Sequence, residues 1–90
     1  GKHIGSTGLS DTILKTNMEA ADEILRQLRL RDMGGIIVCD FIDMEDADSK
    51  KKLLDYFSNG LGRDRARTRV GKISSLGLIE LTRKRTGESV

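Results

Sequence analysis

The amino-acid sequence predicts an α/β fold in which a small mixed sheet is combined with two main helices. The predicted order of elements is helix, strand, helix, strand, strand. Three observations predict this order: two segments with apolar residues at helical spacing, a continuous apolar run between them, and two alternating segments near the end. The 90 residues suffice for one domain or subdomain, and we treat residues 1–90 as a single unit.

The first helix is expected over about residues 11–31. Ser10 is its expected N-cap, because a hydroxyl can accept a hydrogen bond from an otherwise unpaired backbone N–H. The apolar residues of this segment recur at spacings of four and three and therefore share one face. These residues are Leu14, Met18, Ala21, Leu25 and Leu28. Gly34 and Gly35 are expected to end the helix, since glycine adopts the left-handed cap conformation without a Cβ penalty.

The apolar run at residues 36–42 predicts a central, parallel strand, because it is apolar on both faces apart from Asp40. A buried carboxylate is costly unless it has a partner, so Asp40 is expected to meet an arginine, backbone N–H groups or a metal ion. Asp40 also lies near the carboxyl end of the strand, where ligand sites form in open α/β sheets. Two readings stay open: a salt bridge to an arginine of residues 63–69, and a magnesium ion held by carboxylate and phosphate oxygens.

The second helix is expected over residues 46–61, and its buried face is expected to contain Leu53, Leu54, Phe57 and Leu61. Acidic residues precede this segment, and negative charge is favourable at the start of a helix. Two further strands are expected at residues 65–73 and 77–83. In the first, arginines alternate with other residues, and in the second, Leu78 and Glu80 alternate with Ile79 and Leu81.

Arginine occupies every second position from Arg63 to Arg69. Because side chains of a strand alternate between its faces, Arg63, Arg65, Arg67 and Arg69 are expected to share one face. Phosphate oxygens suit such a stripe, since the planar guanidinium binds them bidentately, and an RNA backbone is a natural target. Alternatively, some of these arginines pair with acidic residues of the same chain or of a neighbouring segment.

The charge distribution points to the same kind of partner. Residues 1–58 carry 8 basic and 11 acidic side chains, whereas residues 59–90 carry 8 basic and 3 acidic ones. A basic C-terminal segment that follows a more acidic N-terminal segment favours a polyanionic partner. No apolar stretch approaches the roughly 20 residues of a membrane-spanning helix. The lone Cys39 excludes an internal disulfide and is typical of a reducing, cytoplasmic setting.

Three long segments resemble the catalytic core of the bacterial ribonuclease E/G family. They are TNMEAADEILRQLRLRDMGGIIVCDFIDM (residues 16–44), DRARTRV (64–70) and ISSLGLIELTRKR (73–85). The similarity extends over about residues 11–85. It implies a magnesium-dependent endoribonuclease, with manganese as a possible substitute, which cleaves single-stranded RNA in RNA processing and decay. The corresponding subdomain of the family resembles deoxyribonuclease I.

The resemblance also implies roles for individual residues. Asp40, the first Asp of DFIDM, corresponds to one of two aspartates that bind the metal ion. The second aspartate belongs to an Asp-x-Asn element just upstream of a Gly-Lys pair like Gly1 and Lys2. Arg67, the second Arg of DRAR, corresponds to a residue of the pocket for the 5′-monophosphate of RNA. We expect Arg65 and Arg69 to contact RNA phosphates beside it.

Several parts of such an enzyme are expected to lie outside these 90 residues. They are the S1 domain and the main 5′-sensor upstream, and a downstream cysteine pair that shares a zinc ion between the subunits of a homo-oligomer. The chain is therefore expected to be an excised part of the catalytic core, inactive by itself. Two alternatives remain: a non-catalytic α/β module that binds RNA or phosphate, and a structural domain in which Asp40 is simply salt-bridged.

Overall fold

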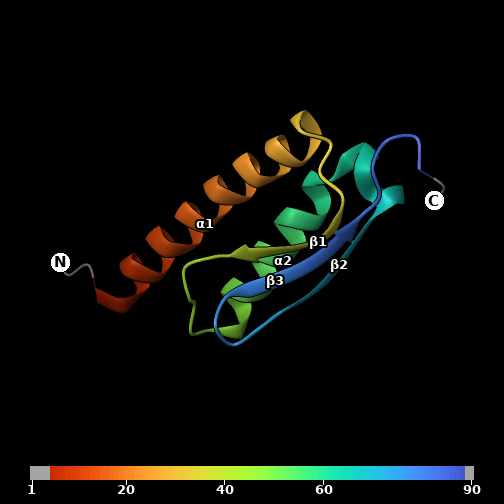
Figure 1. Cartoon of the computed structure of the whole chain (residues 1–90). Helices are drawn as coiled ribbons and strands as arrows, with labels where there is room; N and C mark the ends of the chain where they lie inside the picture. The colour runs from red at the N-terminus through yellow and green to blue at the C-terminus, as the bar shows by residue number, and fades with distance from the viewer. Residues whose placement is uncertain (1–4, 89–90) are drawn as a thin grey trace.

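The computed structural model describes residues 5–88. They form α1 (Gly5–Leu30), β1 (Gly35–Asp40), α2 (Ala47–Gly60), a 3₁₀ helix η1 (Gly62–Arg67), β2 (Thr68–Ile73) and β3 (Leu78–Arg83). The predicted α/β class is confirmed, as is the order helix, strand, helix, strand, strand, with η1 as an additional element. Both main helices pack on one face of the sheet, so the fold has two layers (Figure 1).

The sheet has the strand order β1-β3-β2, and both strand pairs are antiparallel. Gly35 pairs with Arg83 at one end of β1, and Asp40 pairs with Leu78 at the other. The predictions of a mixed sheet and of a central, parallel strand at residues 36–42 are therefore wrong. Within residues 5–88, β1 is an edge strand with a partner on one side only.

The reason for this error lies in the two faces of β1. Ile37 and Cys39 point toward the helices, and Cys39 is buried. Ile36 and Val38 point the other way and are 72% and 58% exposed. The strand is apolar on both sides, although only one side is covered by residues 5–88. Hydrophobicity alone does not distinguish such a strand from one that is buried on both faces.

The core lies between the sheet and the two helices. Ala21, Leu25 and Leu28 of α1 are buried there, as predicted from their spacing. The predicted buried face of α2 is also confirmed, with Leu53, Phe57 and Leu61 buried and Leu54 partly so. Phe57 packs edge-on against Phe41, with ring centroids 6.3 Å apart. No helix within residues 5–88 combines the length and the apolar character needed to cross a bilayer.

The ends of the helices differ in how well they were predicted. α2 begins after Asp46, whose carboxylate accepts a hydrogen bond of 2.8 Å from the Ser49 backbone N–H. Ser10 is not an N-cap, because α1 already begins at Gly5 and the backbone at Ser10 is helical. The end of α1 is also not formed by a glycine, since Asp32 adopts the left-handed conformation, with φ of 48°.

Candidate functional site

The sequence-predicted site residues lie at the two opposite ends of the sheet. Asp40 is paired with Leu78, at the first residue of β3, whereas Thr68, which directly follows Arg67, is paired with Arg83 at the last. At roughly 3.4 Å per residue, the length of β3 separates these ends by about 17 Å. Asp40 and Arg67 therefore belong to two separate places on the chain.

Asp40 is exposed on the face of the sheet that the helices leave uncovered. The expectation of a buried carboxylate is thus wrong, and so is the salt bridge to an arginine of residues 63–69, because no ion pair or side-chain hydrogen bond within residues 5–88 involves Asp40. An exposed carboxylate is well solvated and needs no partner. Its position still leaves both oxygens free to bind a ligand.

The backbone that follows Asp40 is held by a buried amide. Asn17, which is only 1% exposed, donates from Nδ2 to the Ile42 carbonyl and accepts from the Ile42 N–H, both at 2.9 Å. On the other side, the Phe41 N–H donates to the carbonyl of Gly77 at 3.0 Å. Gly77 has φ of 85°, and a Cβ there would lie 2.7 Å from the Phe41 carbonyl oxygen. These contacts fix the course of the chain immediately after Asp40.

Asn17 was not among the site residues predicted from the sequence. A signal for it exists, because position 17 falls on the apolar face of the first helix, one turn after Leu14 and one turn before Ala21. A polar residue on a buried face indicates a specific hydrogen-bond partner. The identity of that partner, 25 residues further along the chain, is not visible in the local pattern.

The carboxylates near Asp40 do not complete a metal site by themselves. Asp46 caps α2, and Asp43 and Glu45 are exposed in the preceding loop. Within residues 5–88, no three His, Cys, Asp or Glu side chains lie close enough together to hold one metal ion. Gly1 and Lys2, which mark the position of the expected upstream element, lie outside the described residues.

The predicted arginine stripe does not exist as a strand face. Arg63, Arg65 and Arg67 lie in η1, and only Arg69 belongs to β2. In a 3₁₀ helix, residues three apart lie above one another. Leu61 and Asp64 are buried on one such row, and Arg67, the next residue on it, is half-buried. The period of η1 is therefore three, whereas the alternation of arginine in the sequence suggested two.

Asp64 belongs to a buried ionic network around Arg83, whose side chain is 2% exposed. Arg83 donates from Nε and Nη2 to the two carboxylate oxygens of Asp64, both at 3.3 Å. Its Nη1 donates to Asp32 at 3.0 Å and to the Met33 carbonyl at 2.7 Å. Burial alone lowers the pKa of Arg83, but the hydrogen bonds to Asp64 and Asp32 outweigh it and raise that pKa. The network joins the turn after α1, η1 and β3.

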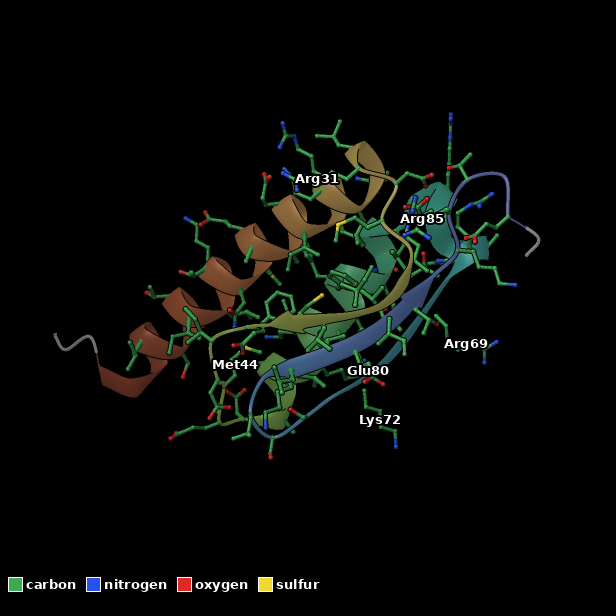
Figure 2. All side chains as sticks on the ribbon, viewed as in Figure 1. Arg31, Met44, Arg69, Lys72, Glu80 and Arg85 are labelled. Atoms are coloured by element: carbon green, nitrogen blue, oxygen red, sulfur yellow. The ribbon has the colours of Figure 1, made fainter. Side chains whose placement is uncertain are left out.

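Beside this network lies a cavity of about 360 Å³ whose charged lining is entirely basic: Arg65, Arg67, Arg69, Arg83 and Lys84. The structure thus brings Arg65, Arg67 and Arg69 together, although not on one strand. Thr68 also lines the cavity, and its hydroxyl is buried without a hydrogen-bond partner in the described part of the chain. Arg69 projects from the sheet on the side away from α1, together with Lys72 and Glu80 (Figure 2).

The guanidinium of Arg67 is already oriented by the backbone. Nη1 donates to the carbonyl of Arg85 at 2.7 Å and, more weakly, to that of Lys84 at 3.5 Å. The Arg67 carbonyl in turn accepts from the Lys84 N–H at 2.9 Å. A guanidinium carries five N–H donors, and within residues 5–88 the Nε and Nη2 donors of Arg67 have no partner, so they can bind an anion. Such an arrangement suits a phosphate, which accepts two parallel hydrogen bonds.

Comparison with known proteins gives consistent matches. The model of the ribonuclease E/G family matches residues 1–86. Over all 90 residues, the chain is 50% identical to ribonuclease G of Escherichia coli strain K12 and 43% identical to ribonuclease G of Haemophilus influenzae. It is 47% identical to ribonuclease E of a Nostoc species. The chain spans 18% of the length of the two ribonucleases G and 13% of that of the ribonuclease E.

Proposed function

Since this chain belongs to the ribonuclease E/G family, we propose that it is part of the catalytic core of an endoribonuclease. The proposed reaction is magnesium-dependent hydrolysis of phosphodiester bonds in single-stranded RNA. Two places on the chain serve this reaction: Asp40 at one end of the sheet and the basic cavity at the other.

The position of Asp40 supports a role in holding the metal ion. Its carboxylate oxygens are the ligands that magnesium prefers, and magnesium usually keeps several waters while one or two carboxylates and phosphate oxygens complete its shell. Asp40 supplies one of these carboxylates, and the resemblance implies a second from an upstream element. Within residues 5–88 the outer edge of β1 has no paired strand, so a neighbouring strand would bring its own carboxylate next to Asp40. The expected Asp-x-Asn element fits that place.

When bound, magnesium supplies a Lewis acid that polarises the scissile phosphate and lowers the pKa of a bound water. The chain itself contributes position. Asn17 and Gly77 fix the backbone beside Asp40, so that the carboxylate stands at a defined point of the uncovered sheet face. Preorganised ligands of this kind are what a metal-assisted displacement requires.

The basic cavity is proposed to bind an RNA phosphate that is not the one cleaved, because it lies about 17 Å from Asp40 along β3. Arg67 is the central residue, since two backbone carbonyls orient its guanidinium and its remaining donors face no carboxylate of the cavity lining. Arg65 and Arg69 add positive charge. A terminal 5′-monophosphate carries more charge than a backbone phosphate and therefore suits this cavity best.

The metal role is tested by placing these 90 residues in the corresponding position of E. coli ribonuclease G, a replacement favoured by the 50% identity. We refer to this protein as the hybrid. We expect it to cleave single-stranded RNA only when magnesium or manganese is present. Asp40→Asn should abolish that cleavage, whereas the matched change Asp55→Asn on α2 should not. An Asp40→Asn hybrid that cleaves like its parent would contradict the proposal.

The role of Arg67 is tested with two RNA substrates that differ only at the 5′ end, one with a monophosphate and one with a hydroxyl. Arg67→Ala should lower the preference of the hybrid for the monophosphate, because the phosphate loses its bidentate partner. Arg63→Ala is the matched control, since Arg63 also lies in η1 but does not line the cavity. An unchanged ratio of kcat/KM for the two substrates in Arg67→Ala would count against this role.

A second candidate function is an RNA- or phosphate-binding module without chemistry of its own. The observation that favours it is the basic cavity, whose charged lining comes entirely from residues 65–84 and does not depend on Asp40. A hybrid that binds 5′-phosphorylated RNA but does not cleave it at any magnesium concentration would support this alternative.

A further inference from the structure

The end of α1 is formed by a residue that is less suited to it than the glycines that follow. Asp32 adopts the left-handed conformation, with φ of 48°. The Met33 N–H donates to the Leu28 carbonyl at 3.0 Å and the Asp32 N–H to the Arg29 carbonyl at 3.3 Å. This pair of hydrogen bonds defines a Schellman cap, in which glycine is the usual residue at the position of Asp32. Aspartate and asparagine enter this conformation more readily than other residues with a Cβ, but still at a cost relative to glycine.

The carboxylate of Asp32 explains why an aspartate occupies this position. It accepts from Nη1 of Arg83 at 3.0 Å, from the Thr86 N–H at 3.0 and 3.2 Å, and from the Thr86 hydroxyl at 3.1 Å. These donors come from 51 and 54 residues further along the chain. The hydrogen bonds, that of the Thr86 N–H above all, lower the pKa of Asp32. Backbone strain that is maintained by side-chain contacts often marks a functional position.

These contacts hold the segment that orients Arg67. Arg83 and Thr86 are the two ends of residues 83–86, and Lys84 and Arg85 lie between them. The carbonyls of Lys84 and Arg85 are the acceptors of Nη1 of Arg67. β3 ends at Arg83, so residues 84–86 continue beyond the sheet. Asp32 therefore fixes both ends of a short segment, of which Arg83 and Lys84 line the basic cavity.

We propose that Asp32 is a positioning residue for this cavity: it holds residues 83–86 so that the Arg67 guanidinium is oriented in advance for a terminal phosphate of RNA. This rests on the function proposed above for the cavity. A guanidinium that is already held in place loses less conformational freedom when the anion binds, and this strengthens binding. The effect is specific to substrates that place a phosphate in the cavity.

The substitution Asp32→Gly separates this role from the structural one. Glycine relieves the strain of the left-handed cap, so the helix end is retained, but the ties to Arg83 and Thr86 are lost. Asp32→Asn is the conservative variant. Asparagine tolerates the left-handed conformation, and its amide oxygen can still accept from the Thr86 N–H. Asp22→Asn is the matched control, since Asp22 is an aspartate of α1 that also accepts from a side chain of another element, the Tyr56 hydroxyl, and does not line the cavity.

The experiment measures kcat/KM of the hybrid for RNA with a 5′-monophosphate and with a 5′-hydroxyl. We expect Asp32→Gly to reduce the ratio of the two values at least fivefold, mainly through a higher KM for the monophosphorylated RNA. Cleavage of the 5′-hydroxyl RNA should stay within twofold of the unaltered hybrid. Asp32→Asn should keep at least half of the ratio, and Asp22→Asn should leave it unchanged. Thermal unfolding of each variant shows whether the fold is intact.

The other results overturn the inference in distinguishable ways. If Asp32→Gly keeps the ratio while Arg67→Ala loses it, the cavity binds phosphate but Asp32 does not position it. If Asp32→Gly lowers both kcat/KM values equally, its role is structural only. If the unaltered hybrid has no preference for the monophosphate, the function proposed for the cavity fails, and the inference fails with it.

Discussion

The two ends of the sheet differ in how much of a site the chain provides by itself. At the Arg83 end, Asp32 from the turn after α1, Asp64 of η1 and Arg83 of β3 form an ionic network, and the basic cavity beside it is lined by two segments of the described chain, residues 65–69 and 82–84. At the Asp40 end, an exposed carboxylate has no partner within residues 5–88, and the outer edge of β1 is unpaired there. The proposed phosphate cavity is thus lined by residues of this chain alone, whereas the proposed metal site needs a further ligand from another segment.

The largest expected change in stability is at the Arg83 end of the sheet, where the buried network lies. Arg83→Ala removes a buried cation. It also leaves Asp64, which is itself buried, without its ion-pair partner. Breaking a buried ion pair from one side typically costs about 3–5 kcal/mol. Because a domain of this kind is stable by roughly 5–15 kcal/mol in total, this variant should be close to unfolding. The free energy of unfolding in urea, measured by circular dichroism, checks the expectation.

Arg65→Ala provides the matched control for Arg83→Ala. Arg65 lines the same cavity but is exposed, and its hydrogen bonds to Ser58 and Asn59 are 3.4 and 3.3 Å long. Its removal should change the free energy of unfolding by no more than about 0.5 kcal/mol. If the two arginine variants had the same urea midpoint, the buried network around Arg83 would not stabilise the fold.

The second effect concerns the loop after Asp40. Asn17→Ala leaves the Ile42 N–H and carbonyl without their partner in a partly buried place, and each unpaired group of this kind costs about 1–3 kcal/mol. The variant should therefore unfold at a lower urea concentration, and the hybrid that carries it should cleave RNA more slowly. Thr16→Ala, an exposed neighbour on α1, is the control and should behave like the unaltered chain.

A smaller, pH-dependent effect is expected at the start of α2. The hydroxyl and backbone N–H of Ser49 lower the pKa of Asp46 from its ordinary 3.8. Because the folded chain favours the ionised form, Asp46 stabilises the fold above pH 3.8 and loses this contribution as the pH falls through the lowered pKa. The melting temperatures of Asp46→Ala and the unaltered chain should therefore differ at pH 7 and converge at acid pH. A difference that is constant with pH would contradict this account.

The same two ends show what the sequence could predict. Helical spacing located α1 and α2 and their buried faces, because a repeat of three and four residues depends on local geometry alone. The edge position of β1 was not predictable, because Ile36 and Val38 are apolar yet exposed. Alternation at residues 63–69 suggested a strand, although the buried positions Leu61 and Asp64 are three apart.

Partners far apart in the chain escaped prediction for a different reason. The tie between Asp32 and Arg83 spans 51 residues, and that between Asn17 and Ile42 spans 25. Local patterns identify a polar residue in an unusual place, but only the fold shows which group it meets. Asp40 illustrates the reverse case, because its apolar surroundings in the sequence suggested burial and the sheet leaves it exposed.

The smallest expected change in stability is at the Asp40 end of the sheet. Asp40→Asn removes the charge of an exposed side chain that has no ion pair within residues 5–88, so the free energy of unfolding should change by less than about 0.5 kcal/mol. In the hybrid, the same substitution should abolish cleavage. Asp40→Asn is thus expected to abolish activity without a loss of stability, whereas Arg83→Ala is expected to lower stability itself. If Asp40→Asn destabilised the chain as strongly as Asn17→Ala, Asp40 would be a structural residue, and its proposed role as a metal ligand would lose its main support.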